Sequence, residues 1–286
     1  MATQTGPEFY CAHSAHTEPG KYTKELARLP NDLLTLCQIV QGVLVHISWA
    51  DKYGLTDKTT LDRTTQPVEE RLKLILEACP VALSQARPPT ARSPGTCRDF
   101  ALVLCSMLRQ HHIPTRIRCG FATYLAPGRL EDHWICEYWK PEEQRWAVAD
   151  AQLNQLHKER LSIMFDTTDV PSGEFLNAGK AWLAFRKGEM AGETFGHGEY
   201  SGDWFLRINV VRDLLALHNQ EVSAWDSWRG ATPESKTLDD GALGMCDRIA
   251  HATENTLGVP TGFDEILDSL RTPPWHRKSG FRLPPE

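Results

Sequence analysis

Cys97, His133 and Asp150 are the residues whose types and order could together carry out covalent chemistry. A cysteine thiolate is a nucleophile, a histidine can take up and return its proton, and a carboxylate can orient that histidine. Thr96, followed three residues later by Asp99, has the pattern of a capping box, which predicts that Cys97 is the first residue of a helix. At that position the helix dipole favours the thiolate, and backbone N–H groups could receive an oxyanion.

The partners of Cys97 are expected on two strands that follow this helix. Residues 133–139 and 145–150 have a strand-like composition, and an antiparallel hairpin between them pairs residues whose numbers sum to about 283. In that register His133 lies opposite Asp150, and the carboxylate can orient the imidazole ring. A slip of one residue would break this pairing, so it depends on the inferred register.

The elements that must position these residues can be read from hydrophobic spacing and from turn residues. Helices are predicted over 31–50, 68–78 and 97–110, and strands over 115–124, 133–139 and 145–150, with a turn at 141–144. Cys97 continues the apolar stripe of the third helix, which is formed by Phe100, Val103, Leu104, Met107 and Leu108. Its sulfur should therefore face whatever this helix packs on, most simply the sheet that follows.

Other residues of reactive type are interpreted as structural. Buried cysteines are usually inert packing residues, and this is the interpretation for Cys37, Cys79, Cys105, Cys119, Cys136 and Cys246. Cys11, His13 and His16 could ligate zinc, although they lack a second closing pair. His111 and His112 follow the predicted helix, where their side chains can bond its last carbonyls.

A glycine-rich segment over 188–202 could be a mobile cover. His197 lies within it, between two glycines, as a residue of such a lid or as an ordinary solvated histidine. The sequence contains no glycine-rich phosphate loop, dinucleotide fingerprint or metalloprotease motif. We therefore predict no cofactor and no metal site.

Composition restricts the class of protein. The chain has 286 residues, 41% of them hydrophobic, which is enough for a folded core, and its net charge of −6 argues against binding to nucleic acid or to an anionic membrane. No stretch has the pattern of a secretory signal or of a membrane span. Eight cysteines without such a signal indicate reduced thiols and a cytoplasmic protein. The expected partner is a small-molecule or peptide substrate, and the oligomeric state is unknown.

Three short motifs resemble the transglutaminase-like superfamily: Gly95-Thr96-Cys97-Arg98-Asp99-Phe100-Ala101, Asp132-His133-Trp134 and Trp146-Ala147-Val148-Ala149-Asp150. The resemblance implies an α+β fold of the papain-like kind, with a nucleophile helix packed on an antiparallel sheet. It also implies that Cys97 is the nucleophile, His133 the general base and acid, and Asp150 the orienting carboxylate. We expect a single domain over 1–286, with this core over about 31–155 and a C-terminal elaboration over about 156–286.

These residues leave more than one function open. The leading hypothesis is acyl transfer through a thioester at Cys97, most simply the hydrolysis of an amide bond. One alternative is an acyltransferase that forms an amide from an amide or thioester donor and an amine. Others are a binding module without catalysis, which an intact Cys, His and Asp set argues against, and a domain stabilised by zinc.

Overall fold

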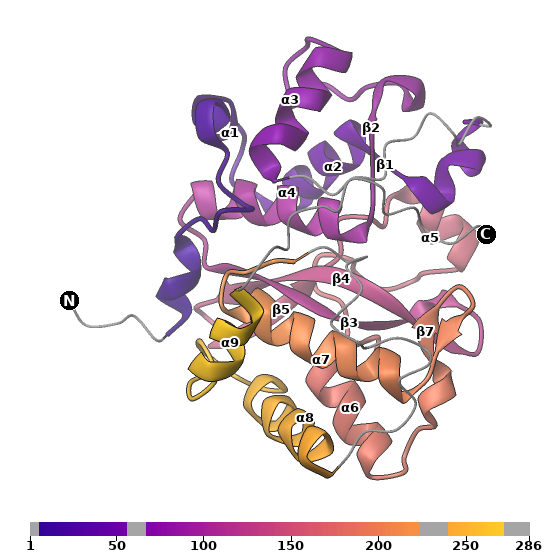
Figure 1. Ribbon diagram of the computed structural model, residues 1–286. Coiled ribbons are helices and arrows are strands. Elements are labelled where there is room, and N and C mark those ends of the chain that lie inside the picture. Colours follow the sequence, from indigo (N-terminus) through magenta and orange to yellow (C-terminus); the bar gives the residue numbers. More distant parts are fainter. Residues whose placement is uncertain (1–5, 56–66, 223–239, 272–286) are drawn as a thin grey trace. The chain divides into compact units, whose positions relative to one another are not determined.

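The computed structural model describes residues 6–55, 67–222 and 240–271 (Figure 1). The chain divides into two units of dense internal contact, which we call the first and the second unit. The first comprises Met1–Arg118 and Trp134–Ser172, and the second comprises Cys119–His133 and Gly173–Glu286. The expectation of a single domain with a core over about 31–155 stays a prediction.

Helices and strands are interleaved along the first unit. Its α-helices are α1 (Thr23–Ala27), α2 (Leu33–Val43), α3 (Val68–Ala78), α4 (Cys97–Gln110) and α5 (Gln155–Leu161), and its 3-10 helices are η1 (Pro7–Cys11), η2 (Gly20–Tyr22), η3 (Ile47–Tyr53) and η5 (Pro89–Ala91). Its strands are β1 (Leu44–His46), β2 (Ser93–Gly95) and β5 (Arg145–Ala149). Two long strands, β3 (Thr115–Ala126) and β4 (Arg129–Lys140), have residues in both units.

The second unit has three further strands and a group of helices. The strands are β6 (Phe175–Asn177), β7 (Phe195–His197) and β8 (Tyr200–Ser201). The helices are α6 (Ala178–Arg186), η6 (Gly192–Thr194), α7 (Asp203–Leu217), α8 (Asp240–Thr253) and α9 (Asp264–Arg271). The glycine-rich segment over 188–202, for which a mobile cover was considered, contains η6, β7 and β8 and ends at Gly202, the N-cap residue of α7.

The fold is α+β, as predicted, with a mixed sheet. In the described residues the strand order is β6-β3-β4-β7-β8, and β5 pairs with β4. The β4–β7 pair is parallel, so the sheet is not antiparallel throughout. A separate parallel pair joins β1 to β2, with His46 opposite Gly95. This short ladder ends two residues before Cys97.

Two of the three predicted helices have the predicted bounds, and the first does not. The helix predicted over 31–50 ends at Val43, where the chain passes into β1 and then η3. The reason lies far along the chain. A Cβ on Gly42 would be 3.2 Å from the Ala86 backbone, and the Gly42 carbonyl accepts a hydrogen bond from Arg87 N at 3.0 Å. The helix therefore ends against the loop that contains Ala86. The hydrophobic spacing within the helix does not reveal this contact.

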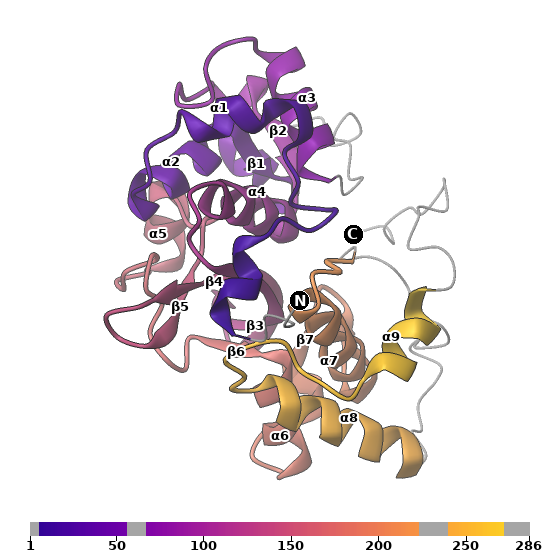
Figure 2. The same cartoon turned by 90° about the vertical axis from the view of Figure 1, so that its left-hand side faces the viewer.

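In the first unit α2 and α3 both pack on α4 (Figure 2). The apolar stripe of α4 is buried, and the helix lies against β4, as predicted. The contact is direct, because Cys136 Sγ donates to Ala101 O at 3.0 Å. At the other end of α4, Arg109 Nε donates to Thr115 O at 2.8 Å.

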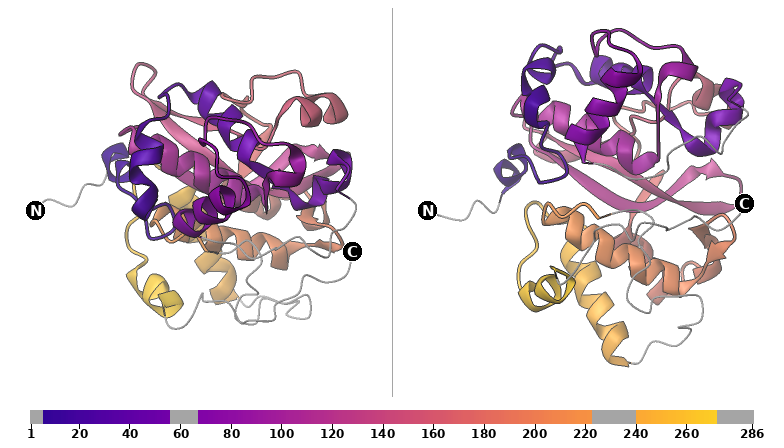
Figure 3. Two further views of the ribbon diagram at one scale, coloured as in Figure 1. Left: turned by 90° about the horizontal axis from the view of Figure 1, so that it is seen from above. Right: turned by 45° about the horizontal axis from the view of Figure 1, so that its top comes forward.

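In the second unit α6, α7 and α8 pack against one another (Figure 3). Trp182 on α6 is fully buried, and its Nε1 donates to Asp247 on α8 at 2.7 Å. From α7, Asp213 accepts a hydrogen bond from Cys119 N on β3 at 3.0 Å. Among the described residues, no helix combines the length and the apolar composition needed to cross a membrane.

Candidate active site

Cys97 is the first residue of α4, as the capping box predicts. Thr96 N donates to Asp99 Oδ2 at 2.7 Å, while the Thr96 side chain accepts from the Asp99 backbone. These reciprocal bonds satisfy groups that a helix start leaves without intrahelical partners. The start of α4 is therefore fixed in place, and Cys97 is 8% exposed.

Arg71 on α3 holds this helix start from outside. Its Nη2 is 3.1 Å from Asp99 Oδ1, and its Nη1 donates to Pro94 O at 2.6 Å and to Ser93 Oγ at 3.1 Å. Arg71 and Asp99 are each 2% exposed. A buried ion pair with these additional hydrogen bonds fixes geometry strongly, because separating the charges would leave one of them unpaired in the interior. One guanidinium thus joins α3, β2 and α4 at the residues that flank Cys97.

Asp150 lies in the first unit, directly after the end of β5. It is 2% exposed; its N–H donates to Thr167 O at 2.9 Å, and its Oδ1 accepts from Gln152 N at 3.0 Å. Its charge reaches α2: burial and then the Asp150 carboxylate raise the pKa of Cys37 to about 12. That thiol is consequently protonated at neutral pH, in keeping with its interpretation as a packing residue.

The register between β4 and β5 differs from the predicted one by two residues. Trp139 pairs with Trp146, whereas the predicted register would place Gln144 there. Predicting His133 directly opposite Asp150 was therefore wrong. The four-residue turn sets the register: Gln144 takes a positive φ of 50°, and its Nε2 donates to Pro141 O at 2.6 Å. A shift of two positions preserves the face of each side chain.

His133 belongs to the second unit, near the middle of β4, and is 1% exposed. The Tyr124 ring meets the His133 ring edge to face, with their centroids 6.1 Å apart. The preceding residue, Asp132, accepts from Asn209 Nδ2 on α7 at 2.6 Å, and burial raises its pKa. The strand that carries His133 is thus tied to α7 immediately beside it.

Sequence reasoning missed the partner of His197. Its Nδ1 is 2.6 Å from Glu131 Oε1, so His197 is one half of an ion pair when protonated. The two residues are 66 positions apart and meet because β7 pairs with β4. The glycines on either side of His197 were the available signal, since they indicate a constrained backbone, but they do not name the partner.

Three other candidates can be placed. Cys11, His13 and His16 are all described, and no group of three metal-ligating side chains occurs within the described ranges. Cys11 Sγ instead donates to His112 O at 3.5 Å. His111 is the C-cap residue of α4. All eight cysteines have free thiols.

Comparison with known proteins bears on the same stretch of chain. Residues 81–151 match the transglutaminase-like superfamily, and this stretch includes Cys97, His133 and Asp150 in that order. Over this stretch the chain is similar to the core of that superfamily, and the predicted superfamily is confirmed there.

A solved structure from Cytophaga hutchinsonii, described as that of a candidate cysteine protease, also resembles the chain. The TM-score is 0.34 and the sequence identity 18%. The aligned part covers 59% of this chain and 44% of the other, so this chain spans less than half the length of that protein. Comparison with curated proteins gives no match.

Proposed function

We propose that the protein catalyses acyl transfer, with Cys97 as the nucleophile, His133 as the general base and acid, and Asp150 as the carboxylate that orients His133. The observation that carries this proposal is the position of Cys97 at the start of α4, fixed by the capping box and by the buried Arg71–Asp99 pair. The transglutaminase-like core supports it, because the matched stretch holds the three residues in the required order.

The chemistry follows from the three side chains. His133 takes the proton of the Cys97 thiol, and the thiolate attacks the carbonyl carbon of the substrate. Backbone N–H groups at the start of α4 stabilise the oxyanion that forms. His133 then donates its proton to the leaving nitrogen, the carbon–nitrogen bond breaks, and a thioester remains on Cys97.

The second half of the reaction decides the product. Water, deprotonated by His133, attacks the thioester and releases a carboxylic acid with the regenerated thiol. We propose this amide hydrolysis, on a small-molecule or peptide substrate, as the principal reaction. An amine in the place of water would give a new amide, and the same acyl-enzyme serves both outcomes.

The proposal can be tested without knowing the natural substrate. Peptide p-nitroanilides and aryl thioesters are incubated with the protein, and the acyl adduct is located by intact-mass and peptide-mapping mass spectrometry. We expect an adduct on Cys97, released as acid in water and as hydroxamate when hydroxylamine is added.

The matched control is Cys105→Ala, because Cys105 is a buried thiol of the same helix, eight residues further on. This variant should form the adduct as the wild type does, whereas Cys97→Ala should not. An adduct of equal yield on Cys97→Ala removes Cys97 from the mechanism. Hydroxamate in large excess over acid at low hydroxylamine concentration would favour the acyltransferase alternative.

A further inference from the structure

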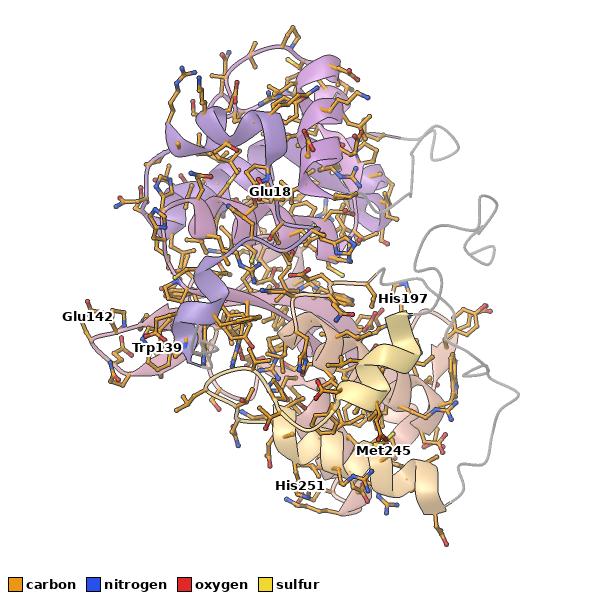
Figure 4. All side chains as sticks on the ribbon, turned by 60° about the vertical axis from the view of Figure 1, so that its left-hand side comes forward. Glu18, Trp139, Glu142, His197, Met245 and His251 are labelled. Atoms are coloured by element: carbon orange, nitrogen blue, oxygen red, sulfur yellow. The ribbon has the colours of Figure 1, made fainter. Side chains whose placement is uncertain are left out.

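The ion pair of His197 on β7 with Glu131 on β4 lies close to His133, because Glu131 is two residues before His133 on β4 (His197 is labelled in Figure 4). In the register of the parallel β4–β7 pair, Glu131 is opposite Gly196, so His197 follows directly on the neighbouring strand. The His197 side chain is 32% exposed and that of Glu131 16%. The pair is therefore partly shielded from water, and its imidazole can still exchange protons with the solvent.

The backbone around His197 is closely constrained. A Cβ on Gly196 would lie 1.9 Å from Tyr200 O, so the β7–β8 hairpin closes only with glycine at this position. Arg129 on β4 donates to the carbonyls of Gly198 and Tyr200. These contacts fasten the hairpin to β4 and fix the direction from which His197 reaches Glu131.

Glu131 and His133 are two residues apart on one strand. Their Cα atoms are about 7 Å apart, and their side chains leave the same face, because side chains alternate along a strand. Asp132, between them, bonds to Asn209 on α7, which is the contact expected of the opposite face. A charge on Glu131 or His197 therefore acts on the His133 imidazole across a short, largely dry distance.

The charges around the pair come from β4, β7 and α7 of the second unit. Arg129 Nε lies 3.7 Å from Glu131 Oε2, Asp132 acts on His197, and Arg212 on α7 acts on Asp132. The uncharged phenol of Tyr124 on β3 faces the His133 ring. Desolvation lowers the pKa of His197, but the hydrogen bond and charge of Glu131 outweigh this, and the net effect is a raised pKa. The protonated form of His197, which compensates the Glu131 charge, is therefore favoured over that of a free imidazole.

We propose that Glu131 and His197 are positioning residues whose charges cancel beside His133, so that proton exchange at His197 changes how readily His133 takes up a proton. The inference rests on the proposed function, in which His133 is the base for Cys97. Losing the proton of His197 exposes the Glu131 carboxylate, which favours the protonated form of His133. The pair thereby couples the protonation of His197, which is partly exposed, to the protonation of His133, which is buried.

The test follows the titration of the histidine rings by NMR in the full chain, with wild type, His197→Asn, Glu131→Gln and the double variant. His197→Asn removes the imidazolium and leaves Arg129, 3.7 Å from Glu131, as the remaining cation beside it, so the titration midpoint of His133 should rise by about one pH unit. Glu131→Gln removes the carboxylate, and with it the interaction that raises the His197 pKa, so the midpoint should fall. The double variant should match Glu131→Gln, because His197 acts on His133 through its pairing with Glu131.

His251→Asn serves as the control, because it removes an imidazole from a more exposed histidine–glutamate pair on α8 (Figure 4). It should leave the His133 midpoint unchanged. A purely structural role would not produce single-variant shifts of opposite sign together with no further effect of His197→Asn once Glu131 is replaced by Gln. Shifts of one sign, or no shift in either single variant, overturn the inference. If His197→Asn is poorly folded, His197→Gln makes the same comparison.

The proposed function has a separate readout in the same variants, the pH profile of Cys97 alkylation by iodoacetamide. With His133 as the base, the midpoint of this profile should move with the His133 midpoint in each variant. A profile that stays fixed while the His133 midpoint moves contradicts the pairing of His133 with Cys97. It leaves the charge coupling between His197, Glu131 and His133 intact.

Discussion

An ion pair lies next to a candidate catalytic residue at two places, the start of α4 and the junction between β4 and β7. The two ion pairs differ in kind. Beside Cys97, Arg71 and Asp99 are each 2% exposed and are joined by further hydrogen bonds to β2. Beside His133, His197 and Glu131 are 32% and 16% exposed. A guanidinium keeps its charge at every physiological pH, whereas an imidazole changes charge close to neutrality.

The difference separates two tasks. A nucleophile at a helix start needs a fixed direction, and a buried guanidinium–carboxylate pair with further hydrogen bonds supplies it. A general base needs a proton affinity suited to the working pH, and a half-exposed imidazole nearby can adjust that affinity. Each of the following experiments probes one side of this contrast.

Removing the reactive group from each unit should have the largest effect. Cys97→Ala should abolish formation of the acyl adduct, and His133→Ala should reduce its rate by about 10³-fold or more, because the thiol loses its base and the leaving group its acid. Asp150→Asn should retain measurable activity, since Asp150 only orients His133. The measurement is the rate of adduct formation with a peptide p-nitroanilide, in which the leaving nitrogen takes up a proton. Asp150→Asn being as inactive as Cys97→Ala would contradict the assigned roles.

Removing the guanidinium beside Cys97 should be the largest change in stability. Arg71→Met leaves Asp99 buried without its charged partner, which should cost about 3–5 kcal/mol of the free energy of unfolding in urea. Lys73→Met is the control on the same helix, because Lys73 is 42% exposed and forms a long ion pair of 3.8 Å with Glu70, which is also exposed. It should be close to wild type. Equal effects of the two substitutions would contradict the anchoring role of Arg71.

A second buried cluster of the first unit, Glu137 with Arg116 and Arg118, predicts how the free energy of unfolding decreases at acid pH. Burial would raise the pKa of Glu137, but the Arg116 and Arg118 guanidiniums outweigh it and lower this pKa to about 2. The folded pKa lies below the ordinary value of 4.5, so the stabilisation is present above that pH and is lost as pH falls toward 2. It is on the order of 3 kcal/mol.

Glu137→Gln should therefore be less stable than wild type at pH 7 and should lose less stability than wild type between about pH 4.5 and pH 2. Urea unfolding across this range measures both effects. Glu143→Gln, on the exposed turn of the same hairpin, is the control and should follow the wild type. If Glu137→Gln lost as much stability as wild type between about pH 4.5 and pH 2, another group would determine the loss of stability in acid.

Competition among the eight thiols is the mildest test. Burial raises the pKa of Cys37 to about 12 and that of Cys246 to about 11, and it raises the pKa of Cys136 as well. Cys97, at a helix start, should be alkylated by iodoacetamide at least about tenfold faster than these three near neutral pH. Peptide mapping at limited reagent gives the order. Cys97 reacting no faster than Cys105 would contradict the expected activation.

A structural feature could be predicted from the sequence when the contacts that determine it lie close together along the chain. The bounds of α3 and α4 and the capping box at Cys97 follow from residues within one turn, and all were predicted correctly. The helix that starts at Leu33 was predicted too long, because the Ala86 loop that ends it lies 44 residues after Gly42.

The candidate site divides in the same way. The types and order of Cys97, His133 and Asp150 are visible in the sequence, and the α+β fold was predicted from the resemblance of the motifs around them to the transglutaminase-like superfamily. The predicted register between β4 and β5 was wrong by two residues, because the turn at 141–144 determines that register. The ion pair between Glu131 and His197 could not be predicted, because it requires a parallel pairing of strands separated by five other elements along the chain.

The short β1–β2 ladder has a consequence for the time course of folding. Its three pairs join Leu44–His46 to Ser93–Gly95, across a connection of 46 residues from 47 to 92. Helix α4 is local and can form within microseconds, but the strand that leads into it is fixed only when this long loop has closed. The helix that begins at Cys97 therefore forms early, whereas its start is oriented late. The entropy of closure varies only with the logarithm of loop length, so the 46-residue connection can vary in length at little cost while the three pairs remain.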